Sequence, residues 1–133
     1  MTYLLDTNIV SYILKRKNTT VENKLRETRR SGQDVFISCI TYYEVKRGLL
    51  YANATSQLAE FNLFHQKYQI LFIDDIEIIE KACEIHADLK TKGTPIQDAD
   101  ILIAATAITR SLILVSNDSD MSRVEGLTLE NWL

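Results

Sequence analysis

The sequence predicts an α/β protein with three layers, in which helices cover both faces of a mostly parallel central sheet. Three observations support this fold class. Short apolar runs rich in β-branched residues alternate along the chain with longer segments of helical periodicity. One proline and four glycines among 133 residues leave little sequence for long connections. The length suits one core, so we expect a single domain over residues 1–133.

The first half of the chain is expected to contain two strands and four helices. Residues 3–5 and 35–38 are apolar and aromatic runs of strand length. Capping-box patterns at residues 19–22 and 41–44 indicate two helix starts, and Gly32 ends the first of these helices. The expected helices cover residues 9–14, 19–30, 41–52 and 55–67.

The second half of the chain is expected to alternate three strands with two helices. An apolar stripe at helical spacing predicts a long helix from Ile76 to about Gly93. A turn at residues 93–96 then precedes a largely apolar helix over residues 98–109. The expected strands are residues 70–73, 112–116 and 127–129.

The charges of the chain are unevenly distributed. Net charge is −3, which argues against a simple nucleic-acid coat. Residues 1–50 nevertheless hold nine Lys and Arg against five Asp and Glu, whereas residues 51–133 hold six against thirteen. A basic patch beside an acidic pocket would suit a polyanionic substrate, although each basic residue is equally expected on a solvated helix face. The candidate residues for binding such a polyanion are Lys15, Arg16, Lys17, Arg26, Arg29, Arg30, Lys46 and Arg47.

The remaining composition predicts a cytoplasmic protein without a membrane segment. No apolar run approaches the roughly 18 residues that a bilayer span needs, and the start of the chain lacks a signal-peptide layout. Cys39 and Cys83 lie in apolar settings, so we expect reduced thiols in the core. His65 and His86 lie within helical stripes and are expected to be packing or surface residues, which argues against chemistry that works through an imidazole acid and base.

Four carboxylates are expected to meet at one edge of the sheet. Asp6 and Asp118 follow apolar strands, while Glu44 and Asp100 occupy the first turns of helices. Ligands of open parallel sheets bind beyond the carboxyl ends of the strands, where these positions converge. Clustered carboxylates stay ionised only with a cation among them. The pattern therefore predicts a divalent metal site and chemistry on a phosphate.

Each acid also has a structural interpretation when it is taken alone. Asp6 could cap the helix that follows it, and Asp118 could be a turn residue. Glu44 could be the third helical residue of a capping box that starts at Thr41. A capping Thr41 would also fix the helix start and so orient Glu44. The joint pattern of four acids favours the metal site over these separate roles.

Four motifs in order resemble those of PIN-domain ribonucleases, in particular the VapC toxins of toxin–antitoxin pairs. They are LLDTNI at residues 4–9, S-x-x-T-x-x-E at 38–44, GTPIQDADILIAA at 93–105, and VSND at 115–118 followed by GLTLENW at 126–132. The resemblance covers essentially the whole chain. It implies a PIN-like three-layer fold and a metal-dependent endoribonuclease, with Mg²⁺ or Mn²⁺ as the cofactor and a metal-activated water as the nucleophile. By motif match, the acidic quartet that would bind metal and carry catalysis is Asp6, Glu44, Asp100 and Asp118.

The resemblance also assigns supporting residues and leaves two positions open. Thr7 and Asn8 would support Asp6 and the bound water. The third motif contains Asp98 as well as Asp100, and we interpret Asp98 as a helix cap. The closing motif contains Asp120 as well as Asp118, and its segment 119–122 is about one residue short and lacks an aromatic. The fourth acid therefore remains open between these two aspartates.

The implied partners are an RNA substrate, a cognate VapB-like antitoxin and a second copy of the chain in a homodimer or a toxin–antitoxin hetero-oligomer. The antitoxin would lay a segment into a groove between two neighbouring helices. That apolar surface, otherwise expected to be core, comprises Tyr42, Tyr43, Leu49, Leu50, Tyr51, Leu58 and Phe61.

Three other classes of protein are weighed against this one. A haloacid-dehalogenase-like phosphatase needs a second acid where Asn8 stands, and a lysine in its closing motifs, whereas the last lysine here is Lys92. A response-regulator receiver lacks the same lysine. The third class is a catalytically silent PIN-like module that binds RNA or protein. The presence of all four acids argues against this class.

Overall fold

A computed structural model describes residues 1–16 and 19–133 of the chain. Lys17, one of the candidate RNA-binding residues, lies outside the described residues. All strand pairs in the five-stranded sheet are parallel, and the strand order is β3-β2-β1-β4-β5. The strands are β1 (Thr2–Leu5), β2 (Asp34–Ser38), β3 (Ile70–Leu71), β4 (Ile113–Val115) and β5 (Leu129–Glu130). The predicted α/β class with a parallel sheet is confirmed.

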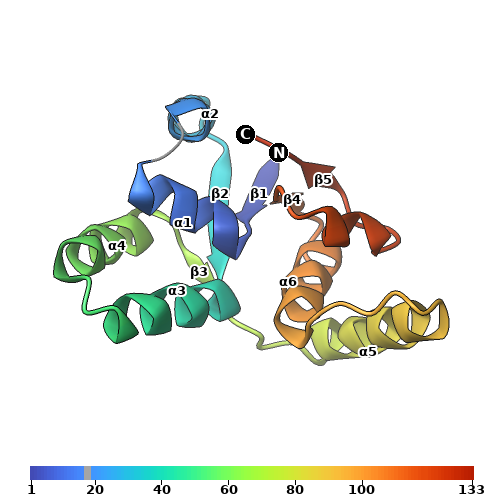
Figure 1. The fold of residues 1–133 in the computed structure, drawn as a ribbon. Coiled ribbons are helices and arrows are strands. Elements are labelled where there is room, and N and C mark those ends of the chain that lie inside the picture. Colours follow the sequence, from blue (N-terminus) through green and yellow to red (C-terminus); the bar gives the residue numbers. More distant parts are fainter. Residues whose placement is uncertain (17–18) are drawn as a thin grey trace.

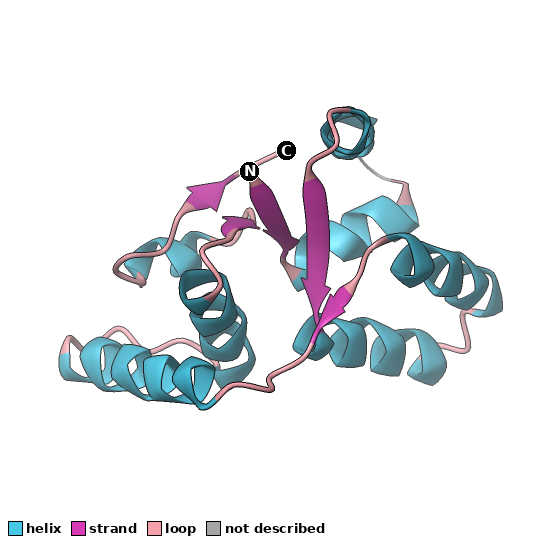
Figure 2. Ribbon diagram, turned by 180° about the vertical axis from the view of Figure 1, so that it is seen from behind, coloured by secondary structure: helices cyan, strands magenta, loops and turns pink. Residues whose placement is uncertain are grey.

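The helices form two layers on opposite faces of the sheet, with β1 at its centre (Figures 1 and 2). One layer contains α1 (Thr7–Lys15), α2 (Thr19–Arg30), α3 (Cys39–Tyr51) and α4 (Thr55–Lys67). The other contains α5 (Ile76–Thr91) and α6 (Asp98–Thr109). All six expected helices are present, and the three-layer arrangement is confirmed.

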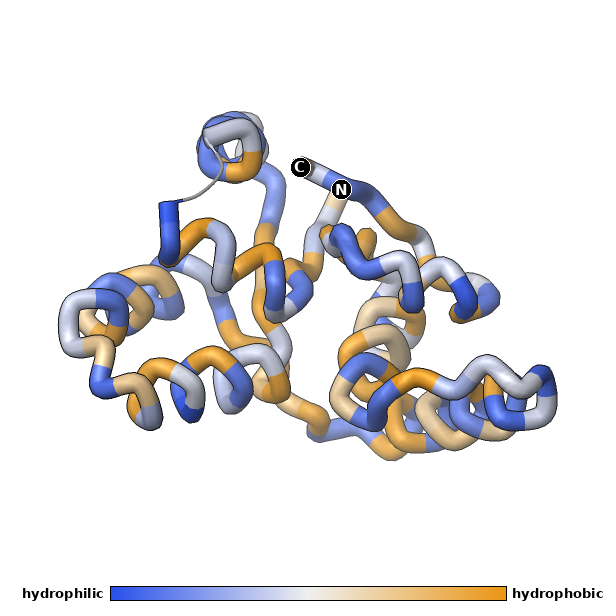
Figure 3. Tube along the Cα trace, in the orientation of Figure 1, coloured by the Kyte–Doolittle hydropathy of each residue, from blue (hydrophilic) through white to orange (hydrophobic). Residues whose placement is uncertain are grey.

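The alternation of side chains along β1 explains why both faces are covered. Tyr3 and Leu5 pack into the hydrophobic cluster beneath α1–α4, whereas Leu4 packs into the cluster beneath α5 and α6. Successive strand residues point to opposite faces, so a strand that is apolar throughout buries both. Figure 3 shows the same pattern, with hydrophobic residues along the central strands and α6 and mainly hydrophilic residues along α2.

Several element boundaries differ from those expected. Helix α1 starts at Thr7 rather than at Ile9, and α3 starts at Cys39 rather than at Thr41. The capping box expected at residues 41–44 is therefore wrong, because Ser38 is the N-cap and accepts a hydrogen bond from the Ile40 amide. A short 3-10 helix at Ser119–Arg123, labelled η1, was not expected.

The structure also corrects the expected burial of some residues. Cys83 is exposed on α5 and Cys39 is only half-buried, so the expectation of two core thiols is wrong for Cys83. On α3, Tyr43 and Tyr51 are 60% and 94% exposed, so the core interpretation fails for them. Within the described part of the chain, no helix combines the length and the apolarity needed to cross a bilayer.

Candidate active site

Asp6 is the most firmly held of the candidate acids. It directly follows β1, and its backbone amide donates to the Val115 carbonyl at 2.9 Å, which extends the pairing of β1 with β4. One carboxylate oxygen caps α1 by accepting from the Thr7 amide at 2.8 Å. The other accepts from the Ser116 hydroxyl at 2.7 Å. Asp6 thus caps a helix and also faces the site, so its two interpretations are compatible.

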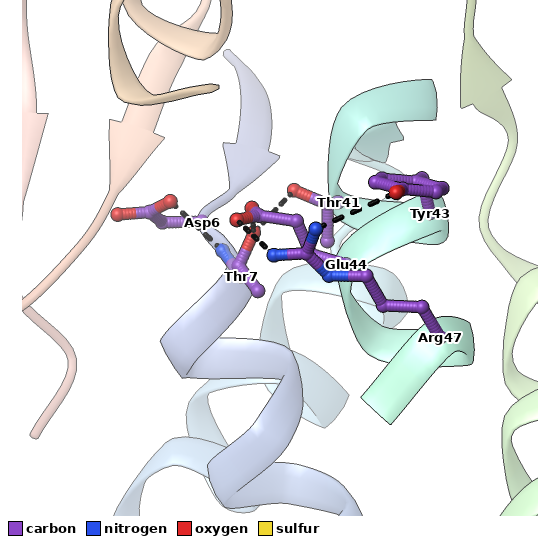
Figure 4. Close-up of polar contacts among 6 residues, drawn as sticks. All are labelled: Asp6, Thr7, Thr41, Tyr43, Glu44 and Arg47. Atoms are coloured by element: carbon purple, nitrogen blue, oxygen red, sulfur yellow. Dashed lines mark hydrogen bonds and ion pairs between the residues drawn. The ribbon is translucent and has the colours of Figure 1, made fainter. Parts of the chain in front are cut away.

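A chain of hydroxyl groups connects α1 to Glu44 on α3 (Figure 4). The Thr7 hydroxyl donates to Glu44 Oε1 at 2.8 Å. Its oxygen also lies 3.0 Å from the Thr41 hydroxyl. A hydroxyl has one proton, so Thr41 must be the donor in that second bond. Thr41 therefore orients Glu44 through Thr7 from inside the helix, while Arg47 contacts the other Glu44 oxygen at 3.9 Å.

Asp118 is brought to the same place by the serine that holds Asp6. The Ser116 hydroxyl accepts from the Asp118 amide at 3.0 Å, and Asp118 caps η1 by accepting from the Asp120 amide at 2.9 Å. Asp120 instead forms an ion pair with Arg123 at 3.2 Å. Of the two candidates for the fourth acid, Asp118 is the one that lines the cavity described next.

One cavity of about 440 Å³ collects these side chains, and we call it the acid cavity. It lies beyond the carboxyl ends of β1 and β4, and Asp100 reaches it from the first turn of α6. Asp98 is exposed and does not cap that helix, because Gln97 is the N-cap and makes no side-chain cap bond. The acid cavity is lined by Asp6, Thr7, Asn8, Ser11, Tyr12, Lys15, Glu44, Asp100 and Asp118.

The acids in this cavity raise one another's proton affinity. Burial, followed by the negative charges of Asp6 and Asp118, raises the pKa of Asp100 to about 6. Burial also raises the pKa of Asp6, although the hydrogen bonds from Ser116 and Thr7 oppose the shift. In the described part of the chain, no hydrogen-bond donor contacts the Asp100 carboxylate. Asp100 is therefore the acid that would gain most from a nearby cation.

The donor set suits a hard divalent cation that keeps water ligands. Every candidate ligand is a carboxylate oxygen, the type that Mg²⁺ and Mn²⁺ favour. Among the described residues, no three His, Cys, Asp or Glu side chains are close enough together to hold a metal ion directly. Mg²⁺ commonly binds through one or two carboxylates and several waters, which fits a cavity with separated acids.

Asn8 and Asn117 form a polar pair at the wall of the acid cavity. The Asn8 amide nitrogen donates to Asn117 Oδ1, while the Asn8 side-chain oxygen is buried and accepts no hydrogen bond within the described chain. Asn117 and Ser116 were not expected to contribute. Ser11 and Tyr12 were also missed, although their positions three and four residues after Asn8 put them on its helix face.

The basic candidates separate into different surfaces. Lys15 lines the acid cavity. Lys46 and Arg47 lie on α3 and contact the rings of Tyr42 and Tyr43. A second cavity of about 660 Å³, which we call the basic cleft, is lined by the cations Arg16, Arg26, Arg29, Arg30 and Lys67, together with Glu22, Glu60 and apolar side chains.

Comparison with known proteins places this arrangement in a family. The model of the PIN domain matches residues 3–127. The chain is 30% identical to Ribonuclease VapC2 of Rickettsia felis, covering 99% of this chain and 98% of that one. It is 31% identical to the tRNA(fMet)-specific endonuclease VapC of Shigella flexneri, covering 98% and 97%. The crystal structure of VapBC2 from Rickettsia felis bound to a promoter DNA fragment matches with a TM-score of 0.92 at 27% identity, covering 100% of each chain.

The chain therefore belongs to the PIN-domain family. Its relatives within that family are VapC ribonucleases, which is the resemblance that the sequence motifs indicated. This membership leaves the phosphatase and receiver alternatives without support.

Proposed function

We propose that this protein is a Mg²⁺- or Mn²⁺-dependent endoribonuclease, the toxin of a VapBC-type toxin–antitoxin pair that acts in the cytoplasm. The observation that carries the proposal is the acid cavity, in which carboxylates from four distant segments of a PIN-family chain face one another. The names of the VapC relatives support ribonuclease activity. The intact set of acids argues against a catalytically silent module.

Asp6, Glu44, Asp100 and Asp118 would hold the cation in this proposal. When bound, the cation supplies charge neutralisation and activates water for attack on phosphorus. The hydrogen bond from Ser116 opposes the effect of burial on Asp6 by favouring its ionised form, and Thr7 and Thr41 fix the direction of the Glu44 carboxylate. Asn8 lines the same cavity, and its buried side-chain oxygen accepts no hydrogen bond within the described residues. The expected products are a 5′ phosphate and a 3′ hydroxyl.

The proposed partner is a VapB-like antitoxin, since solved relatives are VapBC complexes. The exposed apolar side chains of Tyr43, Leu50 and Tyr51 on α3 leave a surface that a protein segment could cover, and a homodimer is the second proposed assembly. The relative from Shigella flexneri is named a tRNA(fMet)-specific endonuclease, which makes transfer RNA the first substrate class to test.

The test is cleavage of purified transfer RNA by the wild type and by Asp100→Asn, with Mg²⁺, with Mn²⁺ and with EDTA. The Asp100→Asn rate should fall by more than the roughly 10–100-fold typical of losing a supporting partner of a metal ligand. Asp98→Asn is the matched control, because Asp98 lies two residues away on α6 but does not line the acid cavity. Its cleavage rate should equal that of the wild type.

Circular dichroism must show both variants folded for the comparison to count. Undiminished wild-type cleavage in EDTA would contradict the metal dependence. If Asp98→Asn and Asp100→Asn lost cleavage activity equally, negative charge in the first turn of α6 would matter, rather than the position of Asp100 in the acid cavity. Release of phosphate from small phosphomonoesters without RNA cleavage would instead favour a phosphatase.

A further inference from the structure

One face of α1 extends the acid cavity away from the carboxylates. Asn8, Ser11, Tyr12 and Lys15 all line the cavity, and they are spaced at i, i+3, i+4 and i+7. That spacing puts them in a single row along the helix. Seven residues of α-helix rise about 10 Å, so the row runs from the acids at the N-terminus of α1 to a cation at its other end.

The polar groups of the two outer members of this row, Tyr12 and Lys15, are not paired within the described part of the chain. Within the described residues, the Tyr12 hydroxyl and the Lys15 ammonium make no hydrogen bond or ion pair with another side chain. Lys15 lines a cavity with four carboxylates yet contacts none of them, whereas Arg47 contacts Glu44 at 3.9 Å. Tyr12 is half-buried and lines the cavity, so part of this residue remains accessible. A cation and an aromatic ring are thus presented to whatever enters the cavity.

The next residue shows where the row ends. Arg16 has a φ of 53° and ends α1 in the left-handed conformation. Its guanidinium lies 3.4 Å from Glu60 and lines the basic cleft. Lys15 and Arg16 therefore serve two different cavities, and Lys15 alone of these two adjacent cations faces the carboxylates.

We propose that the Tyr12–Lys15 end of this row binds the RNA strand next to the bond that is cut. This inference rests on the proposed function. Tyr12 stacks on a base adjacent to the scissile phosphate, and Lys15 binds a neighbouring phosphate of the same strand. Single-stranded RNA fits because an unpaired base can leave its neighbours and stack on an aromatic ring. The row of Tyr12 and Lys15 is a positioning surface, and Ser11 lies between it and Asn8.

The charges of the cavity favour such a contact. Acids that hold a cation for catalysis also repel the phosphates on either side of the cut. A lysine about 10 Å along the helix from the acid end offsets that repulsion for a flanking phosphate without neutralising the acids themselves. Stacking on Tyr12 then fixes the strand between these two points.

The first experiment measures binding of a mixed-sequence single-stranded RNA oligonucleotide by fluorescence anisotropy, with every variant made in Asp100→Asn so that the RNA stays intact. Tyr12→Ala should weaken binding by about 5–150-fold, the range that base–aromatic stacking supports, and Tyr12→Phe should restore it. Phe72→Ala removes an exposed aromatic side chain that lines neither the acid cavity nor the basic cleft, and this control should bind as the parent does. A loss shared by Tyr12→Phe would overturn stacking.

The second experiment measures the salt dependence of the same binding. Lys15→Ala should reduce the slope of log affinity against log salt by about 0.7, the value of one phosphate contact on a single strand. Lys90→Ala on α5 is the matched control and should leave the slope unchanged. If Lys15 only tuned the acids, Lys15→Ala would shift the pH profile of cleavage with an unchanged RNA affinity, and that outcome would overturn the proposal.

Cleavage of transfer RNA in the otherwise wild-type protein separates this inference from the proposed function. Tyr12→Ala and Lys15→Ala should raise KM more than they lower kcat, and mapping of 5′ ends should show a changed nucleotide preference beside the cut for Tyr12→Ala. A wild type that cuts no RNA contradicts the proposed function. A wild type that cuts, with folded Tyr12→Ala and Lys15→Ala variants that cut and bind identically, contradicts only this inference.

Discussion

The acid cavity and the basic cleft differ in how the chain builds them. The acid cavity takes residues from α1, α3, α6 and the segment after β4, which meet only because the parallel strands end at one edge of the sheet. The basic cleft is lined mainly by α2 and α4, helices that belong to one layer. Sheet topology creates the first, and the exposed sides of packed helices create the second.

This difference changes the interpretation of the basic residues. The excess of Lys and Arg in the first 50 residues was expected to form a patch beside the acids. The structure instead puts Arg26, Arg29 and Arg30 in the basic cleft, where none of the four candidate acids takes part, and leaves Lys15 in the acid cavity. The two cavities should therefore make separable contributions, with turnover set in one and electrostatic attraction in the other.

Among uncharged side chains, the largest effect on the cleavage rate should come from Ser116, which supports two acids of the acid cavity. Ser116→Ala removes the hydroxyl that donates to Asp6 and accepts from the Asp118 amide. We expect the rate of RNA cleavage to fall by about 10–100-fold, because two of the four acids lose a common support. Single-turnover cleavage of transfer RNA measures this.

Ser122→Ala is the matched control for that change. Ser122 lies in η1, is exposed and donates to the Ser119 carbonyl at 2.6 Å. Its cleavage rate should match the wild type. An unaffected Ser116→Ala rate would show that Asp6 and Asp118 do not depend on their shared serine.

A smaller effect is expected from the basic cleft. Charge reversal at Arg29 and Arg30 should weaken RNA binding by a few-fold to about tenfold at low salt and flatten its salt dependence, because phosphate contacts release fewer counterions. The cleavage rate at saturating RNA should stay the same. Arg29 lies 5.3 Å over the Tyr68 ring, so Arg30→Glu alone is the variant that leaves this packing intact.

Lys90→Glu on α5 changes the net charge by the same amount as Arg30→Glu alone, lines neither cavity, and controls for non-specific repulsion. Unchanged RNA affinity at low salt in the Arg29 and Arg30 variants would refute a role for the cleft in RNA binding. A fall in the saturating rate would show that the two cavities act as one.

The sequence was informative where a motif and a strand end coincide. Asp6 and Asp118 were expected at one edge because each follows a strand, and both line the acid cavity. The bridging role of Ser116 was hidden, because it depends on β1 lying beside β4, two strands more than a hundred residues apart. The metal-binding roles of the four acids stay predictions.

Errors in the sequence analysis came from local patterns with more than one meaning. Thr41 and Glu44 fit a capping box, yet Thr41 is buried inside α3 and bonds to Thr7 of another helix. Asp98 was expected to cap α6 but is exposed. Cys83 fitted the apolar stripe of α5 but lies on its exposed side. Tertiary contacts decided each case, and no local pattern encodes them.

The smallest expected effect concerns stability and again separates the acid cavity from the rest of the surface. The pKa of Asp100 is raised from 3.8 to about 6, so the folded protein binds this proton more tightly than the unfolded chain does. Between about pH 4 and pH 6 the folded state carries more bound proton, and the free energy of unfolding therefore falls as pH rises. The stabilisation is complete below the unfolded pKa and lost above about pH 6. The side chain at position 100 of the Asp100→Asn variant cannot ionise, so this variant does not lose stability as pH rises through this range.

In the absence of divalent metal, Asp100→Asn should thus be more stable than the wild type at pH 8 and equal to it below pH 4. A shift of two pKa units corresponds to about 3 kcal/mol, but the carboxylate is partly exposed and screening reduces this to roughly 1 kcal/mol. That amounts to about 4 °C in Tm for a domain of this size, measurable by calorimetry in EDTA. Asp98→Asn, whose carboxylate lies outside the cavity, should show no such gain.

Adding Mg²⁺ should then raise the Tm of the wild type more than that of Asp100→Asn, because only the wild type has repulsion at this position for a cation to relieve. Equal Tm values for the two proteins at pH 8 in EDTA would mean that the acids of the cavity do not destabilise one another.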